Sequence, residues 1–213
     1  MTRLIHIEAS PRREQSLSTA MARYYLDRLR ADESRLEIDR LPLWEMELPS
    51  FDGDALNAKY ARLQNASLSG PQQVAWREIE ALVKRLNAAD QVLISTPMWN
   101  MGVPYRLKHF IDLVTQPGIS FAFEPGVGYR PLLLPRPTTV IIASSGDYSS
   151  GESYGRPDLA TNYLKAALAF IGLTDVEVIP VAPTAGTREA VEHGHARAKG
   201  RVDEAVEELR ALS

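Results

Sequence analysis

The chain has 213 residues, enough for one domain with a sizeable hydrophobic core. Its apolar fraction of 45% and charged fraction of 24% are ordinary for a globular protein, and a net charge of −3 is too small to indicate a nucleic-acid partner. The absence of cysteine excludes disulfides, thiol nucleophiles and cysteine-based zinc or iron–sulfur sites. The start resembles no signal peptide, and no apolar run approaches the roughly 20 residues of a membrane span, so we expect a cytoplasmic protein without a membrane partner.

Short apolar runs alternate with helical patterns along the chain. Strands are expected at 4–7, 36–41, 92–95, 138–144 and 176–181. Helices are expected from Ser18 onward and over 71–87, 104–115, 159–171 and 187–212. The helix at 71–87 follows a capping box and is expected to bury Val74, Ile79, Leu82, Val83 and Leu86. The Pro- and Gly-rich segment 119–137 is expected to leave the sheet, for example as a hairpin.

Five strands separated by helices predict an α/β fold with a doubly wound parallel sheet. The number of strands favours a flavodoxin-like sheet in the order 2-1-3-4-5, with helices on both faces, over the six-stranded dinucleotide-binding fold. No linker or repeat divides the chain, so residues 1–213 are expected to form one domain.

Three polar loops follow strands whose carboxyl ends meet near the switch point of such a sheet. The first includes Ser10, Ser16, Leu17, Ser18 and Thr19; the second is Pro97-Met98-Trp99-Asn100-Met101; the third is Ser144-Ser145-Gly146-Asp147. We therefore expect the three loops to share one ligand.

The first loop feeds a helix N-terminus and carries several hydroxyl groups, which favours a phosphate ligand. It lacks glycine, so it matches neither a dinucleotide fingerprint nor a Walker loop, and a monophosphate such as flavin mononucleotide (FMN) fits better. An ordinary cap cluster is an equally good reading of this loop alone. The second loop offers Asn100 and flat or soft side chains to a ring, although a buried Met/Trp cluster would look similar. The third loop alone could be a surface turn.

These loops and several further segments together resemble the family of FMN-dependent NADH azoreductases and quinone reductases. The matching segments are Ser10…Ser16-Leu-Ser18, Thr96-Pro-Met-Trp-Asn-Met101, Pro104-x-x-Leu107-Lys108-His-Phe110-Ile-Asp112, Gly118-Ile-Ser-Phe121 and Phe170-Ile-Gly172-Leu-Thr-Asp175-Val. The resemblance implies FMN held by Ser10, by 16–18, by 97–101 and by 144–147. It also implies a homodimer with two sites at its interface.

The family's chemistry implies a ping-pong cycle in which NADH or NADPH reduces the flavin and a quinone or azo compound then takes two electrons. The flavin performs the hydride transfer, and no side chain stands out as a catalytic acid or base. Aromatic residues expected to line the substrate site are Phe121, Phe123, Tyr129 and Tyr148. His193 and His195 lack a third ligand, so no metal site is expected.

One loop departs from the family pattern, which commonly reads Ser-Arg-Gly-Gly where this chain has Ser144-Ser145-Gly146-Asp147. If Asp147 lies near the flavin ring, its charge should lower the flavin potential, and Asp147→Gly should raise it. The alternative function is a flavodoxin-type electron carrier, although such carriers are usually shorter and more acidic. A serine hydrolase is disfavoured because no Gly-x-Ser-x-Gly elbow is present. Arg12 and Arg13 leave the choice between NADH and NADPH open.

Overall fold

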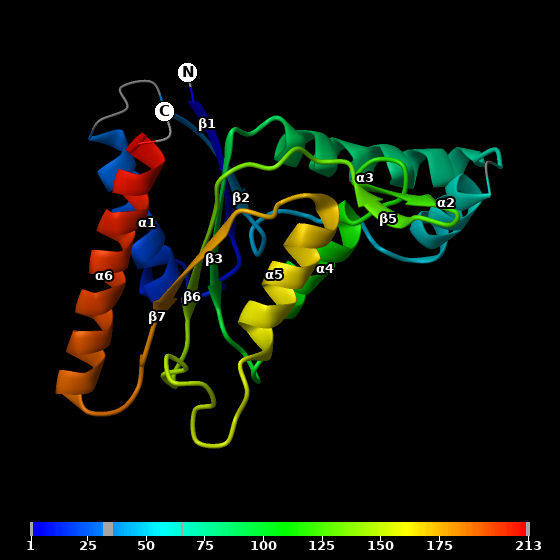
Figure 1. Cartoon of the computed structure of the whole chain (residues 1–213). Coiled ribbons are helices and arrows are strands. Elements are labelled where there is room, and N and C mark those ends of the chain that lie inside the picture. Colours follow the sequence, from blue (N-terminus) through cyan, green and yellow to red (C-terminus); the bar gives the residue numbers. More distant parts are fainter. Residues whose placement is uncertain (1, 32–35, 65, 212–213) are drawn as a thin grey trace.

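Five parallel strands form the central sheet of this computed structural model, which describes residues 2–31, 36–64 and 66–211 (Figure 1). The strands are β1 (Thr2–Glu8), β2 (Leu36–Pro42), β3 (Gln91–Pro97), β6 (Thr138–Ala143) and β7 (Val176–Val181). They pair in the order β2-β1-β3-β6-β7, so the predicted 2-1-3-4-5 order is confirmed. The parallel register places Glu8 opposite Ser95 and Pro97 opposite Ala143, which aligns the carboxyl ends of β1, β3 and β6.

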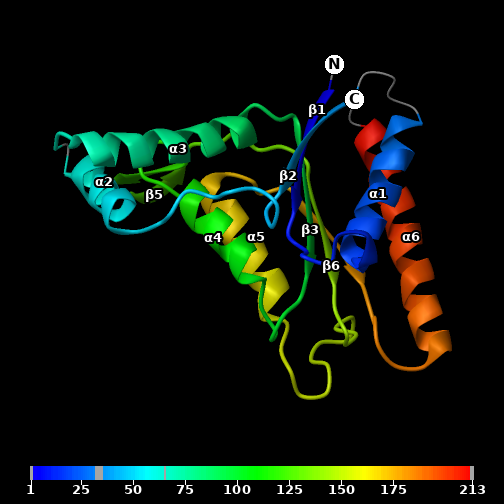
Figure 2. The ribbon, with the colours of Figure 1, turned by 180° about the vertical axis from the view of Figure 1, so that it is seen from behind.

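Helices cover both faces of the sheet (Figures 1 and 2). α1 (Leu17–Arg30) and α6 (Arg188–Ala211) pack on one face, and α3 (Gly70–Asn87), α4 (Tyr105–Val114) and α5 (Leu159–Ile171) pack on the other. Successive residues of a strand point to opposite faces of the sheet. On β3, Leu93 packs in the cluster that contains α1 and α6, and Ile94 packs in the cluster that contains α3, α4 and α5. Burial on both faces explains why the central strands are continuous apolar runs.

An arm projects from the amino-terminal end of the sheet (Figure 1). It consists of α2 (Gly53–Leu63), the first half of α3, and a hairpin of β4 (Phe121–Glu124) and β5 (Gly128–Pro131). The hairpin lies at this end because α4 starts after the carboxyl end of β3 and returns the chain to the start of β6. Its backbone is tied there by the Leu133 amide, which donates to the Ile171 carbonyl at 3.1 Å. The predicted hairpin is therefore confirmed.

Local signals set most helix boundaries as predicted. The Ser69 amide donates to the Gln72 side chain at 3.0 Å, which gives α3 its reciprocal cap. Gly172 ends α5 with a φ of 114°, a conformation that costs a glycine little. The predicted core face of α3 is wrong at one position, since Val74 is 49% exposed and Trp76, two residues on, is buried. Val74 lies in the arm, where it lines a cavity between α3 and the 47–54 segment.

Candidate functional site at the carboxyl ends of the strands

Backbone hydrogen bonds join the three predicted loops at one edge of the sheet. The Ala9 amide donates to the Ser95 carbonyl at 2.8 Å, and the Met98 amide donates to the Ala143 carbonyl at 2.7 Å. The Ser144 amide donates to the Val181 carbonyl at 3.2 Å, so the ladder continues to β7. The loops after β1, β3 and β6 thus lie side by side at the end of the sheet opposite the arm, as Figure 1 shows.

The first loop gathers buried hydroxyl groups around the start of α1. Ser10, Ser16 and Ser18 are all buried, whereas Leu17 is partly exposed. Ser16 Oγ accepts from the Thr19 amide at 3.2 Å and lies 3.1 Å from Ser18 Oγ. The first turn of a helix leaves amide groups without helical partners, and these carry the positive end of the helix dipole. Hydroxyl and amide donors in this arrangement fit a phosphate monoester.

The second loop contains a strained turn. Trp99 and Gly102 exchange both backbone hydrogen bonds at 2.9 Å, and the two residues between them, Asn100 and Met101, have positive φ angles of 49° and 67°. Asparagine tolerates this conformation, but methionine rarely adopts it. The Met101 carbonyl accepts from the Leu159 amide at 3.1 Å, which ties the turn to the start of α5. Strain held by surrounding bonds is typical of ligand sites, and here it presents the Trp99 and Asn100 side chains at the surface.

The third loop is held by side chains as well as by backbone. Ser144 Oγ donates to the Gly146 carbonyl at 2.8 Å. A Cβ at Gly146 would lie 2.3 Å from Ser153 Oγ and 2.9 Å from Ser153 Cβ, so a larger residue at this position would displace Ser153. Ser145 is exposed. The 144–147 loop therefore packs closely against the 149–158 segment.

Asp147 faces α6 and is not an isolated charge. Its Oδ2 accepts from Arg197 Nη2 at 2.6 Å, and its Oδ1 accepts from the Ser149 amide at 2.9 Å. Partial burial opposes ionisation, but these hydrogen bonds outweigh it and lower the pKa of Asp147 below its usual value. The sequence did not reveal that the Arg197 guanidinium supplies a counter-charge to Asp147.

Trp44 belongs to this edge although its sequence position did not single it out. Its Nε1 donates to the Ala9 carbonyl at 2.9 Å, and its ring lies 5.8 Å from that of Trp99 and 5.0 Å from that of Tyr105. It thus connects the first loop with the second. Its position directly after β2 could have predicted this placement, because the carboxyl end of β2 lies at the same edge of the sheet as the three loops.

The four residues predicted to line a substrate site fall into two groups. Tyr148 lies in the third loop and is half-buried. Phe121, Phe123 and Tyr129 lie on the β4–β5 hairpin, at the opposite end of the sheet (Figure 1). There Phe121 is buried against Phe170 with ring centroids 4.9 Å apart, and Phe123 and Tyr129 are 54% and 65% exposed. One chain alone does not bring the hairpin aromatics to the loops.

A row of polar side chains runs from buried Ser95 and His6 through Glu8 to exposed Arg40. His6 Nε2 lies 3.0 Å from Ser95 Oγ, and its Nδ1 lies 3.3 Å from Glu8, which in turn accepts a hydrogen bond from Arg40 Nε at 2.7 Å. Burial lowers the pKa of His6 to about 4 despite the attraction of Glu8. His6 is therefore neutral at pH 7. These side-chain contacts connect β1 with β3 through Ser95 and with β2 through Arg40.

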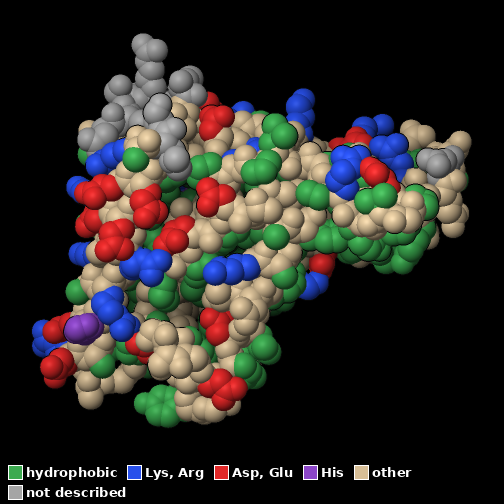
Figure 3. Space-filling model, in the orientation of Figure 1, with side chains coloured by type: hydrophobic (Ala, Val, Ile, Leu, Met, Phe, Trp, Pro, Cys, Tyr) green, Lys and Arg blue, Asp and Glu red, His purple; other side chains and the backbone are tan. Residues whose placement is uncertain are grey.

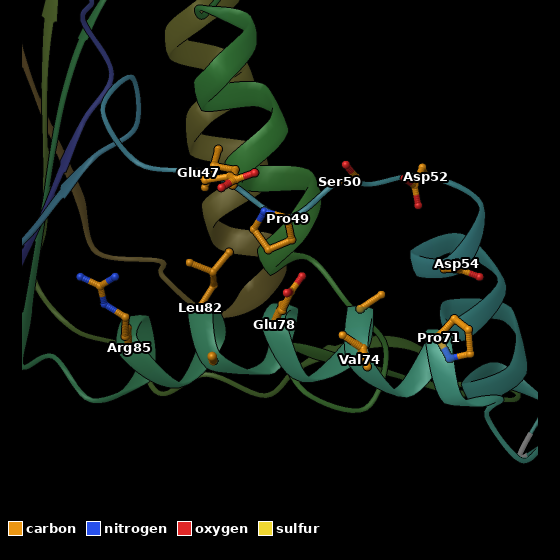
Figure 4. Close-up of a pocket in the computed structure, with 13 residues that line it drawn as sticks. Glu47, Pro49, Ser50, Asp52, Asp54, Pro71, Val74, Glu78, Leu82 and Arg85 are labelled. Carbon is orange, nitrogen blue, oxygen red and sulfur yellow. The ribbon is translucent and has the colours of Figure 1, made fainter.

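Several hollows adjoin the loops, and a larger one lies elsewhere. A cavity of about 220 Å³ adjoins Ser10 and Trp44, one of about 310 Å³ adjoins Leu17, and one of about 490 Å³ adjoins Gly146 and Asp147. A larger cavity, about 770 Å³, lies under the arm between α3 and the 47–54 segment (Figure 4). There the side chains of Val74 and Leu82 rise from α3 among several carboxylates. It touches none of the three loops.

Gly194 separates His193 from His195 for a packing reason. A Cβ there would lie 2.3 Å from the Ala182 carbonyl oxygen, so glycine lets α6 approach the end of β7.

Within residues 2–31, 36–64 and 66–211, three or more His, Asp or Glu side chains never gather closely enough to hold a metal ion. Over the same residues, every helix is too short or too polar to cross a membrane.

The sheet order and its loops define a protein of the flavodoxin-like class. A family model described as flavodoxin-like fold matches residues 2–206. An FMN-dependent NADH:quinone oxidoreductase 1 of Bradyrhizobium diazoefficiens is 44% identical over 191 residues, covering 90% of this chain and 91% of that protein. An FMN-dependent NADH:quinone oxidoreductase of Desulfotalea psychrophila is 37% identical over 212 residues, covering 100% of both. The chain therefore belongs to the flavodoxin-like family that includes these FMN-dependent NADH:quinone oxidoreductases.

A solved structure shows the same fold at lower sequence identity. An FMN-dependent NADH-azoreductase from Bacillus anthracis, in complex with FMN, superimposes with a TM-score of 0.86 at 23% identity. The match covers 98% of this chain and 99% of that one. The shared fold thus extends over the whole length, arm included.

Proposed function

We propose that this chain is an FMN-dependent oxidoreductase that transfers two electrons from NADH or NADPH to quinones and reductively cleaves aromatic azo compounds. The relatives named above support the cofactor, the electron donor and the quinone acceptor. Bound FMN would supply the redox chemistry, and the protein would bind and orient the reactants. The whole chain, residues 1–213, would act as one FMN-binding domain.

The single observation that carries the proposal is the hydroxyl-lined start of α1 beside the strained 99–102 turn. The FMN phosphate would take the hydroxyl groups of Ser10, Ser16 and Ser18 and the amide of Leu17. The ring would lie along 97–101, against the backbone of Pro97 to Met101, with the 144–147 loop at its other side. This arrangement uses neutral donors around the phosphate, consistent with the pairing of Arg13 with Glu45 and of Arg40 with Glu8.

The same site would bind the two substrates in turn. Reduction by NADH followed by release of the nicotinamide leaves the same surface for a flat acceptor, so a ping-pong order follows. Trp99 is 37% exposed and Tyr148 half-buried, and both would flank the substrate from within the chain. In this proposal the side chains position the reactants, and no residue is assigned as an acid or base.

We further propose a homodimer in which the arm of one subunit completes the site of the other. Phe123, Tyr129 and Val127 are 54%, 65% and 79% exposed on a hairpin that cannot reach its own loops. Figure 3 shows hydrophobic side chains gathered on the underside of the arm. Tyr60 and Leu63 on α2 and Val74 on α3 are also exposed. Exposed apolar patches of this kind mark protein interfaces. The hairpin aromatics would then cover the substrate site of the partner.

A visible spectrum tests the proposed function. Purified protein mixed with FMN should bind the flavin. The bound flavin should lose its visible absorbance with NADH under anaerobic conditions and regain it on addition of a benzoquinone. Bound flavin that NADH cannot bleach would contradict the enzyme and favour an electron carrier. Failure to bind FMN would contradict the assignment of all three loops.

A further inference from the structure

Arg197 on the outer helix α6 reaches the loop that follows β6. Its Nη2 donates to Asp147 Oδ2 at 2.6 Å and to the Ala182 carbonyl at 2.9 Å. The reach is short because Gly194, one turn earlier on α6, allows the helix to pass directly over Ala182. One guanidinium thus joins three segments: α6, the end of β7 and the 144–147 loop.

The Asp147 end of the 144–147 loop depends on the contact with Arg197. Its inner half is fixed by backbone bonds, since the Thr184 amide donates to the Ser144 carbonyl at 2.9 Å and the Ser144 amide donates to Val181. Beyond Gly146, the described hydrogen bonds of Asp147 side-chain atoms go to Ser149 and to Arg197. Other charged side chains near this cavity are Glu152, which also lines it, and Arg156, whose Nη2 would lie 3.5 Å from a Cβ at Gly146.

We propose that Arg197 is a positioning residue for the flavin loop and that, by pairing with Asp147, it sets the electrostatic field that this loop presents to bound FMN. The inference rests on the proposed function, in which the 144–147 loop binds FMN. Reduction adds electrons to the flavin, so a negative charge nearby disfavours it and a positive charge favours it. Asp147 and Arg197 together are nearly neutral, and removal of either leaves the other unbalanced.

Three variants separate this role from mere packing: Arg197→Gln, Asp147→Asn and the double variant. Spectroelectrochemical titration of the FMN-loaded protein should show Arg197→Gln lowering the equilibrium constant for two-electron reduction by about tenfold, which corresponds to about 30 mV. Asp147→Asn should raise it by a similar factor, and the double variant should return close to the wild type. The shifts should shrink in high salt, because the Arg197 and Asp147 side chains are 46% and 34% exposed.

Arg201→Gln is the matched control, because Arg201 also lies on α6 but pairs with Glu177 on β7, away from the loops. It should leave the potential unchanged. If Arg197→Gln weakens FMN binding too far to titrate, Arg197→Lys keeps the charge and should restore the wild-type potential. Equal potentials in wild type and Arg197→Gln, shifts of the same sign in both single variants, or failure of lysine to restore the potential would each overturn the inference.

Limited proteolysis without FMN tests the positioning role alone. Tyr154, in the segment after the 144–147 loop, is 93% exposed and offers a chymotrypsin site. Arg197→Gln and Asp147→Asn should each speed cleavage there several-fold, and Arg201→Gln should not. Wild-type protein that binds no FMN would contradict the proposed function, whereas wild type that binds FMN with an unresponsive potential would contradict this inference only.

Discussion

The two ends of the sheet differ in how their side chains are held. At the carboxyl end, the loops are joined by backbone bonds, buried hydroxyl groups and a turn with two positive φ angles. At the amino end, the arm carries exposed Phe123 and Tyr129 on a hairpin of two short strands. The first end is preorganised to hold a ligand, and the second presents an apolar surface that has no cover within the described chain. The difference teaches that one fold can hold a rigid set of polar loops at one edge of its sheet and an exposed apolar surface at the other, which in the proposed function are the cofactor site and the dimer surface.

Removal of hydroxyl groups at the carboxyl end should have the largest effect. Ser16→Ala with Ser18→Ala should weaken FMN binding more than 100-fold, because each hydrogen bond to a charged phosphate contributes about 2 kcal/mol. Fluorescence titration of FMN measures this, and Ser50→Ala, beside the cavity between α3 and the 47–54 segment, is the control. Loss of the cap at Ser16 should cost only about 1 kcal/mol of stability, so the variant should still fold. Unchanged FMN affinity would show that the phosphate lies elsewhere.

Acid should destabilise the carboxyl end through His6. Its pKa of about 4 in the folded protein lies below the unfolded value of 6.5, so the unfolded chain binds the proton first. The stabilisation is complete above pH 6.5 and is lost as the pH falls toward 4, a difference of roughly 3 kcal/mol. Urea unfolding across this range should show a flatter pH dependence for His6→Gln than for the wild type. Identical slopes would mean that His6 is not buried as a neutral group.

Changes in the arm should alter turnover and leave flavin binding intact. Phe123→Ser combined with Tyr129→Ser should lower kcat/KM for a quinone about tenfold, because the proposed substrate site would lose two aromatic walls. FMN affinity should stay within about twofold of the wild type, since the proposed flavin contacts come from the loops and not from the hairpin. Steady-state kinetics at saturating FMN checks the first claim and fluorescence titration the second. Weaker FMN binding with unchanged kinetics would reverse the roles assigned to the two ends.

Relief of the strained turn should have the smallest effect. Met101→Gly should raise the free energy of unfolding by about 1 kcal/mol, because glycine adopts a φ of 67° without the penalty that methionine carries. Met98→Gly is the matched control, and it should lower stability because Met98 packs against the core. Chemical denaturation measures both. A less stable Met101→Gly would show that the turn is not strained.

The apolar runs of the strands and the polar residues that follow them were enough to predict the order of the strands in the sheet and the meeting of the three loops. The apolar runs of β3 and β6 could only be buried strands, and parallel strands bring their carboxyl ends together. The tertiary partners were not predictable in this way. Arg197 meets Asp147 across 50 residues, and Trp44 meets Trp99 through ring packing, and neither contact leaves a periodic signal.

The hairpin aromatics and Val74 show a different limit. Alternation placed Phe121 and Phe123 on one strand, but only the path of the chain after α4 reveals that this strand lies at the amino end. Helical spacing placed Val74 on the apolar face of α3, but the helix extends beyond the sheet into the arm. A local pattern reports which face of an element is apolar, whereas the surroundings decide what covers it.

Subunit mixing tests most directly the claim that the two ends serve one site in trans. A loop variant (Ser16→Ala with Ser18→Ala) and an arm variant (Phe123→Ser with Tyr129→Ser) should each have little activity. After co-refolding in equal amounts, a mixed dimer would pair the intact loops of one subunit with the intact arm of the other. Random mixing predicts recovery of about a quarter of wild-type activity, since half of the dimers hold one complete site of two. Activity that never exceeds the average of the two variants would contradict the account.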